Sequence, residues 1–342
     1  MAAPSVVGLD IGSMSIRAAE AGRTKDGPVL SNFGYAPVPP GVLQGGVITD
    51  EAVITALLKE LWATGKFRSK RVVLGVTNPQ VVVREMAVNN LPRAEMRQAL
   101  PFQVRDALPL PVEKSLLDFC PLEPPGPKET VRGLLIAAPK EAVLTAVKAT
   151  ERAGLHVERV DLASFALVRS VSRLDAQVEA IVDIGARSTT VVVHTDGVPQ
   201  IVRTIPRGGA EITETVASRL DVAFDEAEQI KCRVGMKSED DADTAAVIGS
   251  AVRPLISEIS SSFAYLTSGE RQTRVARLAL SGGGSRLVGL RDALAGMLGV
   301  EVAFVDPILR VRGLRRVRNG PLEHFRASAA VAIGLALKGS AS

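Results

Sequence analysis

Two stretches of this chain share one design, and they constrain its fold more than any other feature. The first is VVGLDIGSMSIRAAE at residues 6–20, and the second is AIVDIGARSTTVVV at residues 180–193. Each is an apolar strand that ends in Asp-Ile-Gly, followed by small or hydroxyl residues and a second strand. Because the copies stand about half a chain apart, they indicate duplication of a whole lobe rather than a short repeat.

The chemistry of this turn points to a phosphate ligand. Burying Asp10 or Asp183 is costly unless a partner compensates its charge. The glycine after each acid allows close approach of a ligand to the backbone, and successive N–H groups can surround an anion. Carboxylates need a cation between themselves and phosphates, for which Mg²⁺ is suited. A single copy could also be an ordinary turn capped by its carboxylate, but two matching copies favour the ligand.

Two weaker motifs follow the second turn. LSGGGSRLVGL at residues 280–290 predicts a flat glycine surface between a strand and a helix start, although it lacks the spacing of a dinucleotide fingerprint. AEQIK at residues 227–231 places Glu228 and Lys231 on one helix face. This pair could accept from and donate to ribose hydroxyls, or it could be a surface ion pair.

The length of 342 residues favours two lobes. We expect a helix over residues 50–64, and a smaller strand-helix-strand-strand unit, closed by a helix, inserted at 78–154. Pro101 should kink or break the helix predicted over 92–108, and Pro254 should kink the one over 242–268. Asp-Gly before residue 198 predicts a hairpin, and residues 324–337 predict a closing helix.

Composition limits the compartment and the partners. The net charge of +4 does not argue for nucleic acid. Two distant cysteines fit a reducing cytosol, and three scattered histidines disfavour a histidine metal site. Asp10 interrupts the first apolar run, so we do not expect a signal peptide. The longest apolar segment, residues 327–337, is too short to span a bilayer. Five arginines within 310–318 could meet anionic lipid or an acidic partner, or form a solvated loop.

The motifs, taken in their order, resemble the superfamily of actin, heat-shock chaperones and sugar kinases. The inserted unit resembles that of FtsA, and within this branch the chain is most similar to the PilM family of type IV pilus assembly. The resemblance implies an α/β protein with the actin-like ATPase fold, in which two lobes flank a nucleotide cleft and carry an FtsA-like inserted subdomain of the 1C type.

The same resemblance implies a division of the chain. Subdomain 1A of the first lobe takes residues 1–77, 155–179 and 310–342, and the inserted 1C-like subdomain takes 78–154. Subdomain 2A of the second lobe takes residues 180–206 and 269–309, and subdomain 2B takes 207–268.

The resemblance also assigns the cofactors ATP and Mg²⁺ to named residues. Asp10 and Asp183 would lie near Mg²⁺, through water, and Asp161 would orient an attacking water, unless it caps the following helix. The nucleotide contacts would be Asp10, Gly12, Ser13, Met14, Ser15, Arg17, Asp183, Gly185, Ser188, Thr189, Thr190, Gly208, Gly209, Glu228, Lys231, Gly283, Gly284 and Ser285.

Two departures from the FtsA pattern bear on hydrolysis. Arg187 replaces a small residue, and Thr190 stands where FtsA-like chains often carry aspartate. We therefore expect ATP binding and at most slow ATPase activity. Arg187 could pair with phosphate or point to solvent.

The function implied is a cytoplasmic scaffold of the type IV pilus, or of a related secretion machine, at the inner face of the cytoplasmic membrane. It would bind the short cytoplasmic tail of a PilN-like membrane protein in a groove beside the inserted unit, and nucleotide would tune that binding. The pilus assembly platform, and possible motor ATPases, would be further partners, without nucleic acid. Two alternatives are an FtsA-like division filament or anchor and a small-molecule phosphotransferase.

Overall fold

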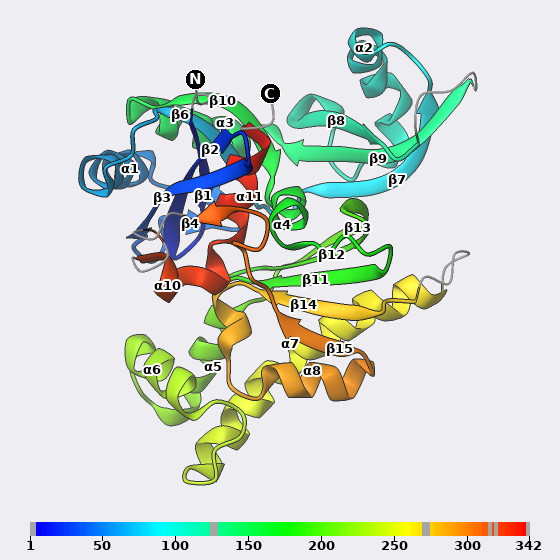
Figure 1. The fold of residues 1–342 in the computed structure, drawn as a ribbon. Coiled ribbons are helices and arrows are strands. Elements are labelled where there is room, and N and C mark those ends of the chain that lie inside the picture. Colours follow the sequence, from blue (N-terminus) through cyan, green and yellow to red (C-terminus); the bar gives the residue numbers. More distant parts are fainter. Residues whose placement is uncertain (1–4, 124–128, 269–273, 314–316, 318–320, 340–342) are drawn as a thin grey trace.

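The computed structural model describes residues 5–123, 129–268, 274–313, 317 and 321–339. Two sheets form the centres of two lobes (Figure 1). The first has the strand order β10-β6-β1-β2-β3-β16, and the second β13-β12-β11-β14-β15. The strands of the first are β1 (Val6–Ile11), β2 (Ser15–Thr24), β3 (Gly27–Pro37), β6 (Arg71–Val76), β10 (His156–Leu162) and β16 (Arg312–Gly313). Those of the second are β11 (Val178–Ile184), β12 (Thr189–Thr195), β13 (Val198–Ile205), β14 (Arg277–Ser281) and β15 (Glu301–Phe304).

The two Asp-Ile-Gly stretches occupy equivalent places in these sheets. β1 pairs antiparallel with β2 and parallel with β6, and β11 pairs antiparallel with β12 and parallel with β14. Asp10 stands opposite Arg17 in the first hairpin, and Asp183 stands opposite Thr190 in the second. The predicted duplication of a lobe is therefore confirmed down to the register.

Two helices lie between the sheets, α4 (Ala163–Val171) and α11 (Ala330–Gly339) (Figure 1). They share an apolar cluster with both sheets, which includes Val73 and Ile181. The helices approach closely because Gly334 faces α4: a Cβ there would lie 1.9 Å from the carbonyl oxygen of Ala166. The single closing helix predicted over 324–337 is wrong, since α10 (Pro321–Phe325) and a 3₁₀ turn precede α11.

The outer face of the first sheet is covered by α1 (Glu51–Gly65) and α3 (Lys140–Arg152). Asp50 caps α1, since its carboxylate accepts from the backbone N–H groups of Ala52 and Val53. The sequence pattern predicts that α3 closes the inserted unit, but Ala149 belongs to the core of the first lobe, and Thr55 of α1 donates to its carbonyl. By its packing, α3 joins the first lobe. The short hairpin β4 (Leu43–Gln44) and β5 (Val47–Ile48) precedes α1.

The inserted unit is a sheet of order β7-β9-β8 with one helix against it (Figure 1). Its elements are β7 (Val82–Asn89), α2 (Arg93–Gln103), β8 (Ser115–Pro121) and β9 (Thr130–Pro139). A separate small core includes Val88, Leu100 and Leu135. Pro101 lies inside α2, and the helix ends at Gln103, before a 3₁₀ turn, as expected from a helix-interrupting proline.

Helices of the second lobe cover the face of its sheet that is away from α4. They are α5 (Gly209–Leu220), α6 (Phe224–Val234), α7 (Ala242–Ser268) and α8 (Leu290–Leu298). Pro254 lies within α7, which continues through it. The predicted hairpin is confirmed between β12 and β13: Asp196 and Gly197 both have positive φ, 49° and 78°, as a tight type I′ turn requires. None of the helices in the described ranges is long and apolar enough to cross a membrane.

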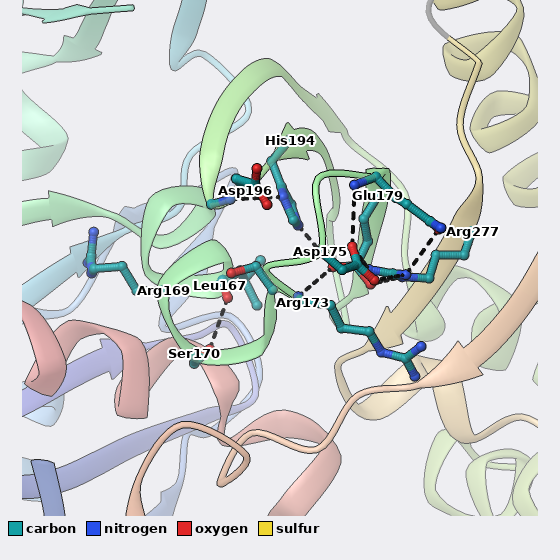
Figure 2. Close-up of polar contacts among 12 residues, drawn as sticks. Leu167, Arg169, Ser170, Arg173, Asp175, Glu179, His194, Asp196 and Arg277 are labelled. Carbon is teal, nitrogen blue, oxygen red and sulfur yellow. Dashed lines mark hydrogen bonds and ion pairs between the residues drawn. The ribbon is translucent and has the colours of Figure 1, made fainter. Parts of the chain in front are cut away.

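The chain crosses from α4 to β11 through residues 172–177, and a buried polar cluster holds this crossing to the second lobe (Figure 2). Glu179 accepts from Arg277 Nε at 2.7 Å and lies 3.0 Å from His194 Nε2. Arg277 also pairs with Asp175 of the crossing through both terminal nitrogens. All three of Glu179, His194 and Arg277 are buried.

The arginine-rich segment is described only in part. Arg310 donates to the Arg169 carbonyl and to Ser172 Oγ, and Arg312 pairs with Asp26 at 3.1 Å. These two arginines therefore have partners within the chain. Arg315, Arg316 and Arg318 lie outside the described residues.

Candidate functional site

The two Asp-Ile-Gly turns face each other across a cavity of about 110 Å³ between the lobes. The same hydrogen bond closes both turns: Gly12 N donates to the Ser15 carbonyl, and Gly185 N to that of Ser188, each at 2.9 Å. Among the predicted residues, the cavity is lined by Asp10, Gly12, Ser13, Met14, Ser15, Arg17, Asp183, Gly185, Ser188 and Thr190. Side chains that lie far apart in the sequence therefore meet as the duplication predicts.

The electrostatics of the cavity favour a cation. Burial raises the pKa of Asp10, although Arg17 NH1, 3.2 Å from its Oδ2, opposes the rise. Burial raises the pKa of Asp183 to about 6, and the charge of Asp10 adds to this, while a hydrogen bond with Ser281 opposes it. Two carboxylates that resist ionisation together would be relieved by a shared cation. Both acids line one cavity, and the described residues gather no group of three or more acidic, histidine or cysteine ligands, so a Mg²⁺ ion here would keep several of its waters.

Arg17 places a positive charge beside Asp10 in this cavity. Its NH1 contacts Asp10, but its buried Nε has no hydrogen-bond partner within the described structure. A buried polar atom without a partner is costly. The orphaned Nε and the cavity that Arg17 lines are together consistent with an anionic ligand at this position.

Arg187 and Thr189 serve the second turn in different ways. Arg187 lines the cavity, and its half-exposed guanidinium pairs with Glu214 Oε1 at 2.6 Å. Thr189 is fully buried, and its hydroxyl donates to the Arg207 carbonyl. Thr189 is therefore placed to hold the turn rather than to line the cavity.

Sequence reasoning missed the loops of the first lobe that complete the cavity. Leu43, Gly45, Gly46, Thr77 and Pro79 also line it. Gly45 and Gly46 have positive φ, 55° and 78°, and a Cβ on Gly46 would clash with Asn78. The Gly-Gly pair was the available signal, because adjacent glycines mark a backbone that other residues adopt with difficulty.

The predicted nucleoside residues meet around Gly209, at the start of α5. A Cβ at this position would lie 3.6 Å from Lys231 Nζ, 3.7 Å from the Gly185 carbonyl oxygen and 3.8 Å from Gly284 Cα. Gly208 also packs against this turn, where a Cβ would lie 2.5 Å from the Gly185 oxygen. Four distant segments therefore converge beside the second turn.

Glu228 and Lys231 do form an ion pair, 2.6 Å from Oε2 to Nζ. The interpretation as a surface pair is wrong for one partner, because Lys231 is only 6% exposed. The burial of Lys231 indicates that this side chain also contacts the interior of the protein.

The triple glycine is explained largely by packing. A Cβ on Gly282 would lie 2.3 Å from the Ile184 carbonyl oxygen, and one on Gly284 would lie 2.5 Å from the Ile184 side chain. Gly283 faces open space. The expected helix start is wrong in detail, since a 3₁₀ turn over Gly283–Arg286 comes first and α8 begins at Leu290. Ser285 is buried, and its hydroxyl donates to the Gly282 carbonyl.

Asp161 lies at the end of β10, and its carboxylate is held by two cations. It accepts from Arg169 of α4, and from Lys338 Nζ of α11 at 2.9 Å. It does not line the cavity between the two turns. The alternative of a helix cap is not observed either, because the N-cap of α4 is Leu162 and lacks a side-chain cap.

Two lobes of matching topology, whose Asp-Ile-Gly turns face one cavity, are the arrangement of the actin-like ATPase fold. Solved structures agree with this class: MreB5 of Spiroplasma citri bound to AMPPNP superposes with a TM-score of 0.55 at 12% identity, covering 96% of this chain and 94% of that one. This likeness concerns the fold.

The chain belongs to the family described as type IV pilus assembly protein PilM, whose family model matches residues 8–340. A structure described as a PilM-PilN type IV pilus biogenesis complex superposes with a TM-score of 0.84 at 29% identity, covering 98% of this chain and 99% of that one. The cell division protein FtsA of Bacillus subtilis is 25% identical over 71% of this chain, which spans only 62% of that relative's length.

Proposed function

We propose that this protein is an ATP-binding scaffold of the type IV pilus assembly platform. The observation that carries the proposal is the pair of facing turns around Asp10 and Asp183, one from each lobe. ATP held by both turns would bridge the lobes, with Mg²⁺ between the phosphates and the two carboxylates. Such a ligand stabilises the arrangement of lobes that it fits best.

In this proposal the protein holds ATP and hydrolyses it at most slowly. Asp161 could orient water only by leaving Arg169 and Lys338, which hold its carboxylate. Breaking such charge-assisted hydrogen bonds is costly. We expect Asp161→Asn to change the affinity for ATP little.

A groove of about 930 Å³ between the inserted unit and α3 is the proposed site for the tail of a PilN-like membrane protein. Leu110 of the inserted unit, and Leu144 and Val147 of α3, form apolar parts of its wall. Leu144 is 50% exposed, so its apolar side chain is available for contact with a partner. Around them the groove carries charges of both signs: Glu51, Glu113, Lys114, Lys140, Glu141, Lys148 and Glu151.

A binding assay with a synthetic tail peptide from the PilN-like protein of the same organism tests the groove. Leu144→Asp should weaken binding at least tenfold, because it places a charge in an apolar contact. Met297→Asp is the matched control, a helical position of similar exposure on α8. Equal affinities for wild type and Leu144→Asp would contradict this site.

Calorimetry with ATP, Mg²⁺ and the same tail tests the coupling. If nucleotide tunes partner binding, each ligand must change the affinity of the other by the same factor. In cells, Leu144→Asp and Asp10→Ala should both release the protein from the membrane fraction. Retention of both variants at the membrane would contradict recruitment to the inner face of the cytoplasmic membrane through the partner.

A further inference from the structure

All three hydrogen-bond donors of the Lys231 ammonium have partners within the protein. Its Nζ donates to the Gly209 carbonyl at 3.1 Å, to Thr213 Oγ1 at 2.8 Å and to Glu228 Oε2 at 2.6 Å. A lysine ammonium has three N–H donors and no acceptor. Since each donor already has a partner, Lys231 has none left for a ligand.

The three partners belong to two helices that pack together. Gly209 and Thr213 lie in the first turns of α5, whereas Glu228 lies on α6 one turn before Lys231. Thr213 is fully buried, and its hydroxyl lies within hydrogen-bond distance of both the Gly209 carbonyl and Glu228 Oε2. The ammonium therefore fastens the start of α5 to α6.

The start of α5 is in turn fastened to the second phosphate-type turn. Gly209 N donates to the Gly185 carbonyl at 2.9 Å, and Ala210 N donates to that of Ala186 at 2.8 Å. A shift of α5 would therefore move the turn that lines the cavity. Neither Lys231 nor Glu228 lines this cavity.

Glu228 differs from Lys231 in what it leaves available. Its side chain is 44% exposed. Oε2 is the atom that faces Thr213 and Lys231, while Oε1 faces the Cys232 thiol, a weak donor, at 3.5 Å. Lys231 and Thr213 keep the pKa of Glu228 below its ordinary value, against the effect of burial, so Glu228 remains an anionic acceptor.

We propose that Lys231 is a positioning residue, which holds the second Asp-Ile-Gly turn in place through α5 and does not itself contact the nucleotide. The inference rests on the proposed binding of ATP. It replaces the expected ribose contact of Lys231 with an indirect role.

The test compares the affinities for ATP and 2′,3′-dideoxy-ATP, both with Mg²⁺. Because dideoxy-ATP lacks both ribose hydroxyls, a variant that loses only a ribose contact should leave its binding unchanged. Lys231→Met should weaken both ligands about tenfold or more, because the phosphate turn loses its support. Unchanged dideoxy-ATP binding by Lys231→Met would overturn the proposal, since it would mean a direct ribose contact.

A second variant tests the link from Lys231 through α5 to the second turn without changing Lys231 itself. Thr213→Val keeps the shape of a side chain that is fully buried, so it should weaken dideoxy-ATP binding in the same direction as Lys231→Met. Thr215→Val is the matched control on the same helix, where the hydroxyl donates to the Glu211 carbonyl within α5 itself. Equal dideoxy-ATP affinities for the two threonine variants would overturn the relay through α5.

Amide hydrogen exchange of the protein without nucleotide tests the link independently of ATP. Lys231→Met should speed exchange at the N–H groups of Gly209 and Ala210 by tenfold or more, whereas Lys237→Met, which changes an exposed lysine, should not. Unchanged protection at these two amides would overturn the proposal. Failure of wild type to bind either nucleotide would contradict the proposed function instead, because the exchange result stands without it.

Discussion

Asp10 of β1 and Arg17 of β2 stand opposite each other, and NH1 of Arg17 lies 3.2 Å from Oδ2 of Asp10 inside the cavity between the lobes. Without a ligand, this arginine is the cation that faces the buried carboxylate most directly. The second hairpin has Thr190 at the equivalent position, so Asp183 has no arginine opposite it in the strand register.

Arg17→Met should therefore destabilise the protein in a pH-dependent way. Loss of the guanidinium raises the pKa of Asp10 further, so folding must bury a carboxylate that is less compensated at high pH. We expect a loss of about 1–3 kcal/mol in the free energy of unfolding at pH 8, and a smaller loss at pH 5. Urea denaturation measures both. Arg17→Lys keeps the charge and should lose less, whereas equal losses at both pH values would contradict the role.

Asp183 should make stability fall as pH rises, when no divalent cation is present. Its pKa is raised from 3.8 to about 6. The protonated Asp183 carboxyl therefore contributes its full stabilisation of the folded state below about pH 4, and this stabilisation is lost as pH rises through 6. Asp183→Asn lacks this titration. Its stability relative to wild type should increase by up to about 3 kcal/mol between pH 4 and pH 7. A difference that stays flat over this range would show that the carboxylate is not perturbed.

The contact between α4 and α11 should tolerate no side chain at residue 334. Gly334→Ala would push a Cβ into the backbone of Ala166, because the distance available is 1.9 Å. We expect a loss of about 3 kcal/mol or more in the free energy of unfolding. Gly296→Ala is the matched control in α8, where a Cβ meets nothing within 4 Å, and should gain about 0.5–1 kcal/mol. A thermal unfolding series that ranks them equally would contradict the close packing.

The Arg277–Glu179 pair should be needed for stability (Figure 2). Arg277→Met leaves Glu179 buried without its strongest cation, which typically costs about 3–5 kcal/mol. Arg291→Met removes an exposed arginine from its pair with Asp292 and should cost under about 1 kcal/mol. Denaturant midpoints compare the two variants, and similar small losses would show that the buried pair is dispensable.

Local patterns were sufficient for much of the fold. The two Asp-Ile-Gly hairpins, the Asp-Gly turn before β13 and the helix over 51–65 could be predicted because alternation of apolar residues, turn chemistry and capping act within a few neighbours. The two facing Asp-Ile-Gly turns could be predicted as well. Because the lobes repeat one design, each turn is expected at the equivalent place in its own lobe.

Contacts between distant segments decided the rest. The sequence by itself determined which residues could bind phosphate and ribose, whereas only the tertiary structure decided which of them have free atoms. Lys231 is saturated by Gly209, Thr213 and Glu228, and Asp161 is held by helices α4 and α11. The physical reason is that a side chain's partners depend on packing across the fold, which no local spacing in the chain records.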